Sequence, residues 1–210
     1  MALNIRTFVV GPIETNCYLV VDDKNKNAVV VDPGDTCAEL EEALDGVTLT
    51  DILVTHAHFD HIAGVSRLVE LTGARVWAHH LEADWLDDPA RNLSAAMGEY
   101  TPAVRVGRPS VLLQGGETTT LLERSLRVAH TPGHTPGHVI YIFDDVVFVG
   151  DLIFCASVGR TDFPGGDSRT LLESIRDQVL SLPDETRLLP GHGPWTTVGH
   201  ERQNNPFLLY

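Results

Sequence analysis

Short apolar runs broken by turn-forming residues dominate the first third of the chain and predict β-strands. The predicted strands span residues 4–10, 16–21, 28–32, 51–55 and 75–78. Two segments instead carry apolar residues at helical spacing, over residues 36–44 and 62–71. The first has Asp35 or Thr36 as a candidate N-cap, and the second stops before Gly73.

The second half repeats this order of strands followed by helices. After a mixed segment with short helices expected around 83–86 and 89–97, the predicted strands span 111–113, 119–122, 126–129, 139–143, 146–149 and 187–189. A helix is expected over 168–182. Two such runs imply an α/β protein, an αββα sandwich of two mixed sheets packed face to face with helices outside. No linker or low-complexity tract divides the chain, so we expect one domain over residues 1–210.

A cluster of metal-binding side chains follows the strand predicted at 51–55. His56, His58, Asp60 and His61 place three imidazoles and a carboxylate within six consecutive residues. Imidazole and carboxylate are the ligands that borderline divalent metals prefer. Four potential ligands in one tight turn are more than one ordinary metal site uses, and they indicate a pair of ions.

Three further candidates occupy the same local context downstream. His134, Asp151 and His192 each come shortly after a short apolar run, where layered α/β folds commonly place their sites. We expect His56, His58 and His134 to hold one ion. Asp60, His61 and His192 would hold a second, and Asp151 would bridge the two.

Such a pair would lie about 3.5–4 Å apart and would generate hydroxide from bound water at neutral pH. Asp60 and Asp151 are therefore the predicted catalytic carboxylates, acting with a metal-bound hydroxide. A single histidine at a strand end is most often packed or solvated, but seven suitable groups in this context favour the metal interpretation. For the other five histidines we expect structural or solvent roles, with support of the metal ligands as the alternative for His130 and His138.

Composition and charge narrow the class of protein. The chain has 210 residues, 43% hydrophobic content and a formal net charge of −14, which opposes binding to nucleic acid or to anionic membranes. Its apolar runs are too short to span a bilayer, and no secretory signal is visible, so a cytoplasmic protein is expected. The three cysteines, Cys17, Cys37 and Cys155, form no disulfide framework. Packing is expected for Cys17, and for Cys155 packing is favoured over a redox role.

The metal turn His56-Ala57-His58-Phe59-Asp60-His61 resembles the HxHxDH signature of the metallo-β-lactamase superfamily. His134, Asp151 and His192 match the remaining ligands of that family in order. The resemblance covers nearly the whole chain and implies the metallo-β-lactamase fold. An aspartate at the bridging position argues against the true β-lactamase branch.

The segments 150–154, 159–167 and 191–197, with Glu201, Asn205 and Pro206, are similar to those of the compact, single-domain glyoxalase II branch. This resemblance implies that Asp32 steadies the metal turn, for which a turn-forming role in Asp-Pro-Gly is the alternative. Only 18 residues follow His192 (210 − 192), so we do not expect the C-terminal domain with which longer members contact glutathione. Arg160 is a candidate for binding an anionic substrate group or for a structural salt bridge. Trp85 and Tyr100 are candidates for capping the pocket or for the core.

The sequence therefore predicts a dinuclear metal hydrolase that cleaves a small-molecule thioester of the S-(hydroxyacyl)glutathione type. Zinc is the first choice for both ions, with iron or manganese as alternatives. Rival interpretations are an iron-dependent oxidoreductase of the persulfide dioxygenase type, a metallo-hydrolase of another ester or lactone, and a non-catalytic binding module. Oligomeric state and the natural acyl and thiol groups stay open.

Overall fold

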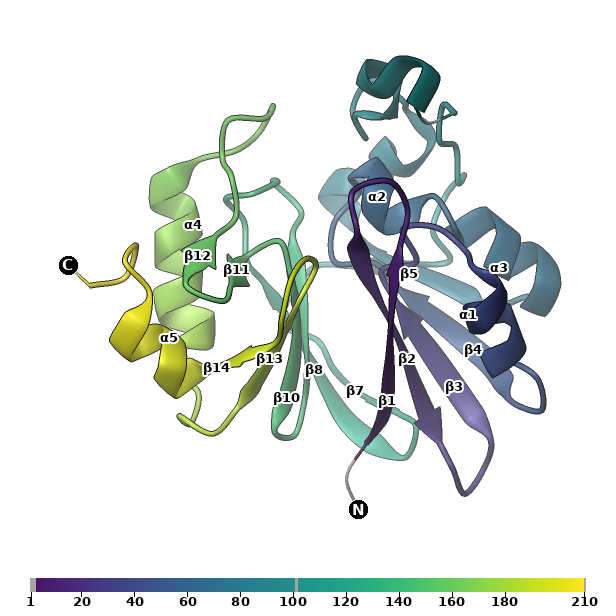
Figure 1. The fold of residues 1–210 in the computed structure, drawn as a ribbon, viewed down its shortest axis with the longest axis horizontal. Coiled ribbons are helices and arrows are strands. Elements are labelled where there is room, and N and C mark those ends of the chain that lie inside the picture. The colour runs from purple at the N-terminus through teal and green to yellow at the C-terminus, as the bar shows by residue number, and fades with distance from the viewer. Residues whose placement is uncertain (1–2, 101, 210) are drawn as a thin grey trace. The chain divides into compact units, whose positions relative to one another are not determined.

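The computed structural model describes residues 3–100 and 102–209 of the chain (Figure 1). The chain divides into two compact units, Met1–Leu113 and Gln114–Tyr210. Each unit contains one six-stranded sheet, and the second also contains a short two-stranded hairpin. The predicted single domain over 1–210 and the face-to-face packing of the sheets stay predictions. Among the described residues, no helix combines the length and apolarity needed to cross a membrane.

The sheet of the first unit is mixed. Its strands, in spatial order, are β1 (Asn4–Val10), β2 (Thr15–Asp22), β3 (Asn27–Val31), β4 (Thr48–Leu53), β5 (Arg75–His79) and β6 (Val111–Leu113). The pairs β1–β2 and β2–β3 are antiparallel, whereas β3, β4, β5 and β6 run parallel. Strand β2 is buried along nearly its whole length, which explains why it reads as a continuous apolar run and not as an alternating one.

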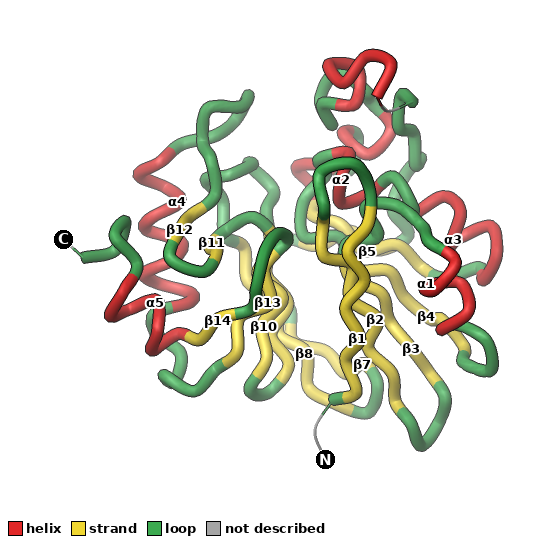
Figure 2. The backbone as a smooth tube through the Cα atoms, in the orientation of Figure 1, coloured by secondary structure: helices red, strands yellow, loops and turns green. Residues whose placement is uncertain are grey.

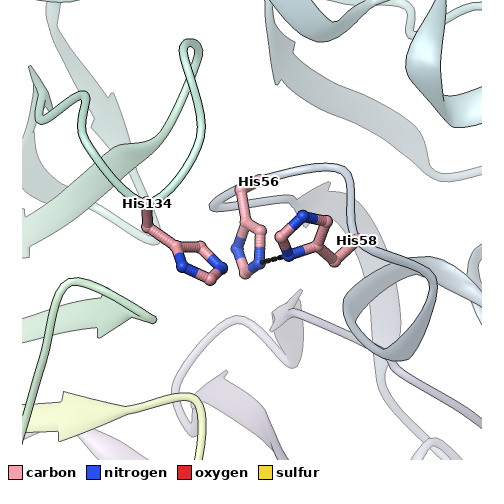
Figure 3. A group of neighbouring side chains, drawn as sticks. All are labelled: His56, His58 and His134. Atoms are coloured by element: carbon pink, nitrogen blue, oxygen red, sulfur yellow. Dashed lines mark hydrogen bonds between the residues drawn. The ribbon is translucent and has the colours of Figure 1, made fainter. Parts of the chain in front are cut away.

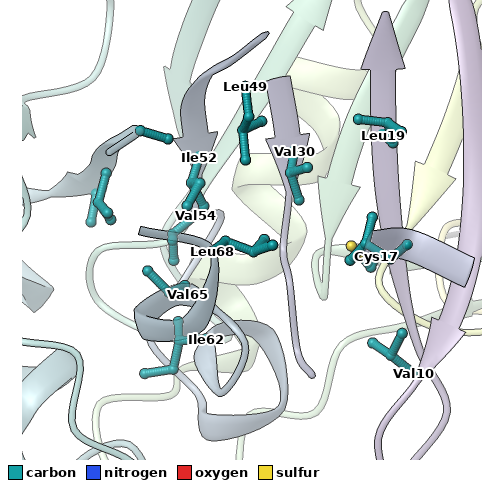
Figure 4. Packing of buried hydrophobic residues seen from close by; sticks show 14 of the residues in the cluster. Val10, Cys17, Leu19, Val30, Leu49, Ile52, Val54, Ile62, Val65 and Leu68 are labelled. Carbon is teal, nitrogen blue, oxygen red and sulfur yellow. The ribbon is translucent and has the colours of Figure 1, made fainter. Parts of the chain in front are cut away.

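Short helices connect the parallel strands of the first unit. They are α1 (Ala38–Ala43), α2 (Phe59–Ile62), α3 (Val65–Thr72) and three 3₁₀ segments, η1 (His80–Glu82), η2 (Trp85–Asp87) and η3 (Ser94–Tyr100). Val65 and Leu68 of α3 pack into the core cluster that also contains Ile52 of β4 (Figure 4). As predicted, α3 stops before Gly73, which takes the left-handed conformation at φ 71°.

Three helix predictions in this unit need correction. The helix predicted over 62–71 is interrupted at Gly64, where a Cβ would lie 2.7 Å from the carbonyl oxygen of Asp35. Helix α1 starts after Cys37, and the Asp35 carboxylate instead accepts a hydrogen bond from the Thr36 amide at 2.8 Å. The helix predicted over 89–97 begins only at Ser94, because the Asn92 side chain forms a local turn by accepting from the Ser94 amide at 3.0 Å.

The sheet of the second unit is also mixed. Its spatial order is β14 (Thr196–Thr197), β13 (Arg187–Pro190), β10 (Val146–Gly150), β9 (Val139–Phe143), β8 (Arg124–His130) and β7 (Thr118–Leu121). Only β10 and β13 pair in parallel among these strands; the other pairs are antiparallel. The hairpin comprises β11 (Ile153–Phe154) and β12 (Ser157–Val158). The predicted strands of both units are confirmed to within a few residues at their ends.

Helices α4 (Ser168–Ser174) and α5 (Val198–Asn204) flank one face of this sheet (Figure 2). Leu171 of α4 and Val198 of α5 belong to one buried cluster with Val147 and Leu188 from the strands. The helix predicted over 168–182 is shorter as an α-helix, because it continues as a π-helical turn, η4 (Ile175–Val179). Strands β11, β12 and β14 are two residues long, too short for a periodic signal, and were not predicted.

Candidate metal centre

The metal turn leaves the carboxyl end of β4 in the first unit. His56, His58, Asp60 and His61 are 2%, 4%, 7% and 0% exposed, so four polar groups share one buried region. His56 Nε2 and His58 Nδ1 lie 3.1 Å apart, as the dashed line in Figure 3 marks; the figure also draws His134 from the second unit. Two imidazole nitrogens at this distance either share a proton or offer their lone pairs to one cation.

Asp60 and His61 form the other half of the turn. His61 Nε2 lies 3.2 Å from Asp60 Oδ2, and the hydroxyl of Thr15 donates a hydrogen bond to the same oxygen at 3.0 Å. Thr15 is the first residue of β2, far from the turn in sequence. The contact orients the carboxylate, and no sequence motif indicated it.

Asp32 supports the turn from the neighbouring strand. It follows β3, which runs parallel to β4, so the carboxyl ends of both strands meet at one edge. Its carboxylate accepts hydrogen bonds from the Thr55 amide at 2.8 Å and the Thr55 hydroxyl at 2.7 Å. Its Oδ2 also lies 3.1 Å from His61 Nδ1. These contacts support the predicted role of Asp32 in steadying the turn.

Two further residues, Glu82 and Gly34, shape the turn, and the sequence did not identify either as a site residue. Glu82, buried at 1% exposure, accepts a hydrogen bond from the amide of Ala57 at 2.7 Å. A Cβ at Gly34 would lie 1.5 Å from the carbonyl oxygen of Asp60, so only glycine fits there. The sequence showed Glu82 only as part of a mixed segment, and Gly34 only as part of a turn.

The second unit brings its three predicted ligands together. His134, Asp151 and His192 follow β8, β10 and β13, whose carboxyl ends share one edge of the sheet. Nε2 of His134 and Nε2 of His192 each lie 3.7 Å from Asp151 Oδ2. This distance is too long for a hydrogen bond. It leaves the Asp151 carboxylate within reach of a cation held by either imidazole.

A backbone contact fixes the orientation of the His134 ring. Its Nδ1 lies 2.7 Å from the carbonyl oxygen of Arg160, which can only accept, so Nδ1 carries the proton. The lone pair is then on Nε2, the atom nearest Asp151. Histidines that bind metals commonly use this arrangement. Gly159 permits the approach, since a Cβ there would lie 1.9 Å from the Asp151 carbonyl oxygen.

The side chain of Arg160 has a different partner. The guanidinium donates two hydrogen bonds of 2.7 Å to the Asp162 carboxylate, and it lies 4.0 Å from the centre of the Phe163 ring. The hydrogen bond from Arg160 lowers the pKa of Asp162 to about 2. This geometry favours the structural salt bridge of the two interpretations, and contact of Arg160 with substrate stays a prediction.

The remaining candidates have local structural contacts. His130 Nε2 lies 2.8 Å from the Pro136 carbonyl oxygen, and His138 Nδ1 lies 2.9 Å from the Thr131 hydroxyl. These contacts brace the loop that carries His134. The Cys17 thiol is fully buried, and burial raises its pKa far above the ordinary range. Trp85 packs against the first core, and the side chain of Tyr100 lies outside the described residues.

Known proteins match this chain along almost its whole length. A hydroxyacylglutathione hydrolase, GloC, from Haemophilus influenzae is 35% identical over 98% of both chains. The crystal structure of the B3 metallo-β-lactamase BLEG-1 has a TM-score of 0.93 and 40% identity, covering 99% of this chain and 100% of that one. The structure of TTHA1623 in a di-iron-bound form has a TM-score of 0.82 and 40% identity, covering 97% and 100%.

The donor groups gathered in each unit are imidazole and carboxylate, which suit zinc, iron and manganese alike. The model of the metallo-β-lactamase superfamily matches residues 10–192, which include every predicted ligand. The two mixed sheets with their helices agree with the fold of the solved relatives. The predicted metallo-β-lactamase fold, with its two mixed sheets and helices, is therefore confirmed, and the chain belongs to the metallo-β-lactamase superfamily.

Proposed function

We propose that this metallo-hydrolase cleaves a thioester of the S-(hydroxyacyl)glutathione type to a hydroxy acid and a thiol. The observation that carries the proposal is that this chain, in which all seven predicted ligands are buried or half-buried, matches a named hydroxyacylglutathione hydrolase over 98% of both lengths. The same match supports a small-molecule substrate.

In this proposal the seven predicted ligands would hold two cations. His56, His58 and His134 would hold the first, Asp60, His61 and His192 would hold the second, and Asp151 would contribute to both. The relative in a di-iron-bound form supports two ions and leaves the choice between zinc and iron to measurement. When bound, the ions supply Lewis acidity to the substrate carbonyl and lower the pKa of a coordinated water.

The protein's own residues hold this set in place. Thr15 orients Asp60, Asp32 holds Thr55 and His61, and the Arg160 carbonyl keeps the proton of His134 on Nδ1. Ligands fixed in this way need no rearrangement when substrate arrives, which is the condition for electrostatic stabilisation of a developing negative charge.

The leaving group decides between a thioester and an ordinary ester. The predicted site contains no strong general acid among the described residues. Apart from the proposed metal ligands it includes Asp32, whose carboxylate accepts hydrogen bonds from Thr55, and Arg160, whose guanidinium pairs with Asp162. A thiol has a pKa of about 8.5 and departs as thiolate without a general acid. An alkoxide departs far less readily, so the ligand set fits a thioester better than an oxygen ester.

The direct test is hydrolysis of S-lactoylglutathione by the purified protein. We expect turnover that stops on chelation and returns when zinc or iron is added back. An exposed histidine outside the site, His80, provides a control, since His80→Ala should keep full activity. The opposite outcome is that the protein fails to hydrolyse a panel of acyl-glutathione and acyl-coenzyme A thioesters but turns over another ester or lactone. That result would reject the proposed thioester substrate and retain the assignment as a hydrolase.

A second candidate function is hydrolysis of β-lactams. The similarity to BLEG-1, a B3 metallo-β-lactamase with 40% identity over nearly the whole chain, is the observation that favours it. A β-lactam also carries an activated carbonyl that a Lewis acid would polarise. Parallel assays with a chromogenic β-lactam and with S-lactoylglutathione separate the two functions: our proposal requires the thioester to have the higher kcat/KM.

The cytoplasmic location stays a prediction from sequence.

A further inference from the structure

A second group of potential metal ligands lies in the second unit and involves none of the seven ligands above. Cys155 occupies the turn of the β11–β12 hairpin, and His200 and Glu201 belong to α5. One ligand atom from each of the three side chains lies within 4.8 Å of the other two. All three residues are in one compact unit, so the group is defined within that unit alone.

Glu201 is a buried carboxylate without a cationic partner. It is 0% exposed, and its oxygens accept hydrogen bonds from the Thr196 hydroxyl at 2.6 Å, the Asn205 amide at 2.7 Å and the Ala156 amide at 3.0 Å. All three donors are neutral. Over residues 3–100 and 102–209, no lysine or arginine pairs with this carboxylate. A buried charge normally has a counter-charge or binds a metal, and a bound cation would supply the missing charge.

The other two side chains complement this carboxylate. Cys155 is a free, half-buried thiol, and His200 is exposed, with Nδ1 in a long 3.4 Å contact with the Asn204 amide. Thiolate, imidazole and carboxylate together form a three-ligand set that zinc and cobalt bind tetrahedrally, with a fourth position for water. The thiol makes this group softer than the histidine and aspartate ligands of the proposed hydrolytic centre.

We propose that Cys155, His200 and Glu201 form an additional binding site for a borderline-soft divalent cation such as Zn²⁺. Binding breaks the S–H bond of Cys155, forms a metal–sulfur bond and releases the proton to solvent, without any change of oxidation state. The site joins the hairpin to α5, which already contact each other through Glu201 and through the Asn205 amide to the Ser157 carbonyl at 3.0 Å. Its function is therefore to fasten the hairpin that follows Asp151.

Cobalt substitution tests the site by a signal that the hydrolytic centre cannot give. Among the seven ligands proposed there, none contains sulfur, so a thiolate-to-cobalt charge-transfer band in the near ultraviolet reports only on a cysteine site. We expect the metal-free protein to bind three Co²⁺ per chain, with this band present. Cys155→Ser should lose the band and bind two, and His200→Ala should lose most of the band at the concentration that saturates the wild type.

Cys37 provides the matched control, because it is also a free, half-buried cysteine but lies in the first unit. Cys37→Ser should keep both the band and the third cobalt. Absence of the band in the wild type, or its loss in Cys37→Ser, overturns the proposal. If Cys155→Ser does not fold, the wild type still decides: zinc should slow alkylation of Cys155 by iodoacetamide, and an unchanged rate overturns the site. None of these readouts depends on hydrolytic activity.

Discussion

Asp32 Oδ2 lies 3.1 Å from Nδ1 of His61, one of the proposed metal ligands. The same carboxylate accepts two hydrogen bonds from Thr55, at the start of the metal turn. One side chain thus holds both the beginning and the end of the turn. Its backbone has φ 49°, a left-handed conformation that asparagine and aspartate adopt more readily than other side chains.

Asp32→Asn should therefore weaken metal binding without disturbing the backbone. The substitution removes the negative charge beside His61, and loss of such a partner typically lowers metal affinity about 10–100-fold. Competition against a chromophoric chelator measures the change. Asp35→Asn is the control, because Asp35 is exposed and its carboxylate accepts a local hydrogen bond from the Thr36 amide. Equal affinities for the two variants would contradict the role of Asp32.

Removing a proposed ligand should have a larger effect. We expect His58→Ala and Asp151→Ala each to abolish thioester hydrolysis and to lower the metal content of the purified protein. Elemental analysis and the hydrolysis assay measure these outcomes, with His80→Ala as the histidine control. Wild-type turnover in either ligand variant would count against the proposed centre.

Gly159 offers a steric test of the same region. A Cβ at this position would lie 1.9 Å from the Asp151 carbonyl oxygen and 3.5 Å from His134 Nδ1, so Gly159→Ala must displace the backbone beside both proposed ligands. We expect it to lower metal affinity and activity together. At Gly46 a Cβ meets no atom within 4 Å, although φ is +77°. Gly46→Ala should therefore lower stability through backbone strain and leave metal affinity unchanged.

The ion pair of Arg160 and Asp162 should make the stability of the protein depend on pH. The pKa of Asp162 is lowered from 3.8 to about 2, chiefly by the hydrogen bond from Arg160. A lowered pKa in the folded state means that the pair stabilises the protein above pH 3.8 and loses this effect as pH falls toward 2. Arg160→Met should return the pKa of Asp162 toward 3.8, as an NMR titration of the carboxyl carbon would show.

The thermal stabilities of wild type and Arg160→Met should accordingly converge as the pH is lowered through this range. A constant difference in Tm between about pH 4 and about pH 2 would show that the pair contributes nothing that titrates. A higher KM for S-lactoylglutathione in the variant would instead assign the guanidinium to substrate binding, the other interpretation of this residue.

The strands, and the crowding of imidazole and carboxylate groups in the turn after β4, were predictable because their signals are local. Each strand is a short apolar run between turn formers, and His56, His58, Asp60 and His61 are neighbours in sequence. A resemblance to a known family then linked the turn with the ligands downstream. The predicted N-cap of α1 was wrong. The sequence shows that the Asp35 side chain is able to accept a hydrogen bond, but it does not show from which amide. In the structure Asp35 uses that capacity one residue away.

The groups that hold the ligands were mostly invisible from sequence, because their contacts join distant segments. Thr15 reaches Asp60 across 45 residues, and Glu82 reaches the amide of Ala57 across 25. Both depend on which strands are neighbours in the sheet, and a hydrophobic pattern does not give that. The carbonyl of Arg160 has no sequence signal at all, since every residue has one.

That carbonyl has a consequence for how the enzyme is able to change over evolution. Residue 160 sets the proton position of His134 through its main chain, whereas its side chain points to a different partner. Natural selection is thus free to replace the side chain, and with it the chemistry presented by this loop, while the proposed ligand His134 keeps its orientation. Adaptation to a new substrate and preservation of the reactive centre are separable at this one position.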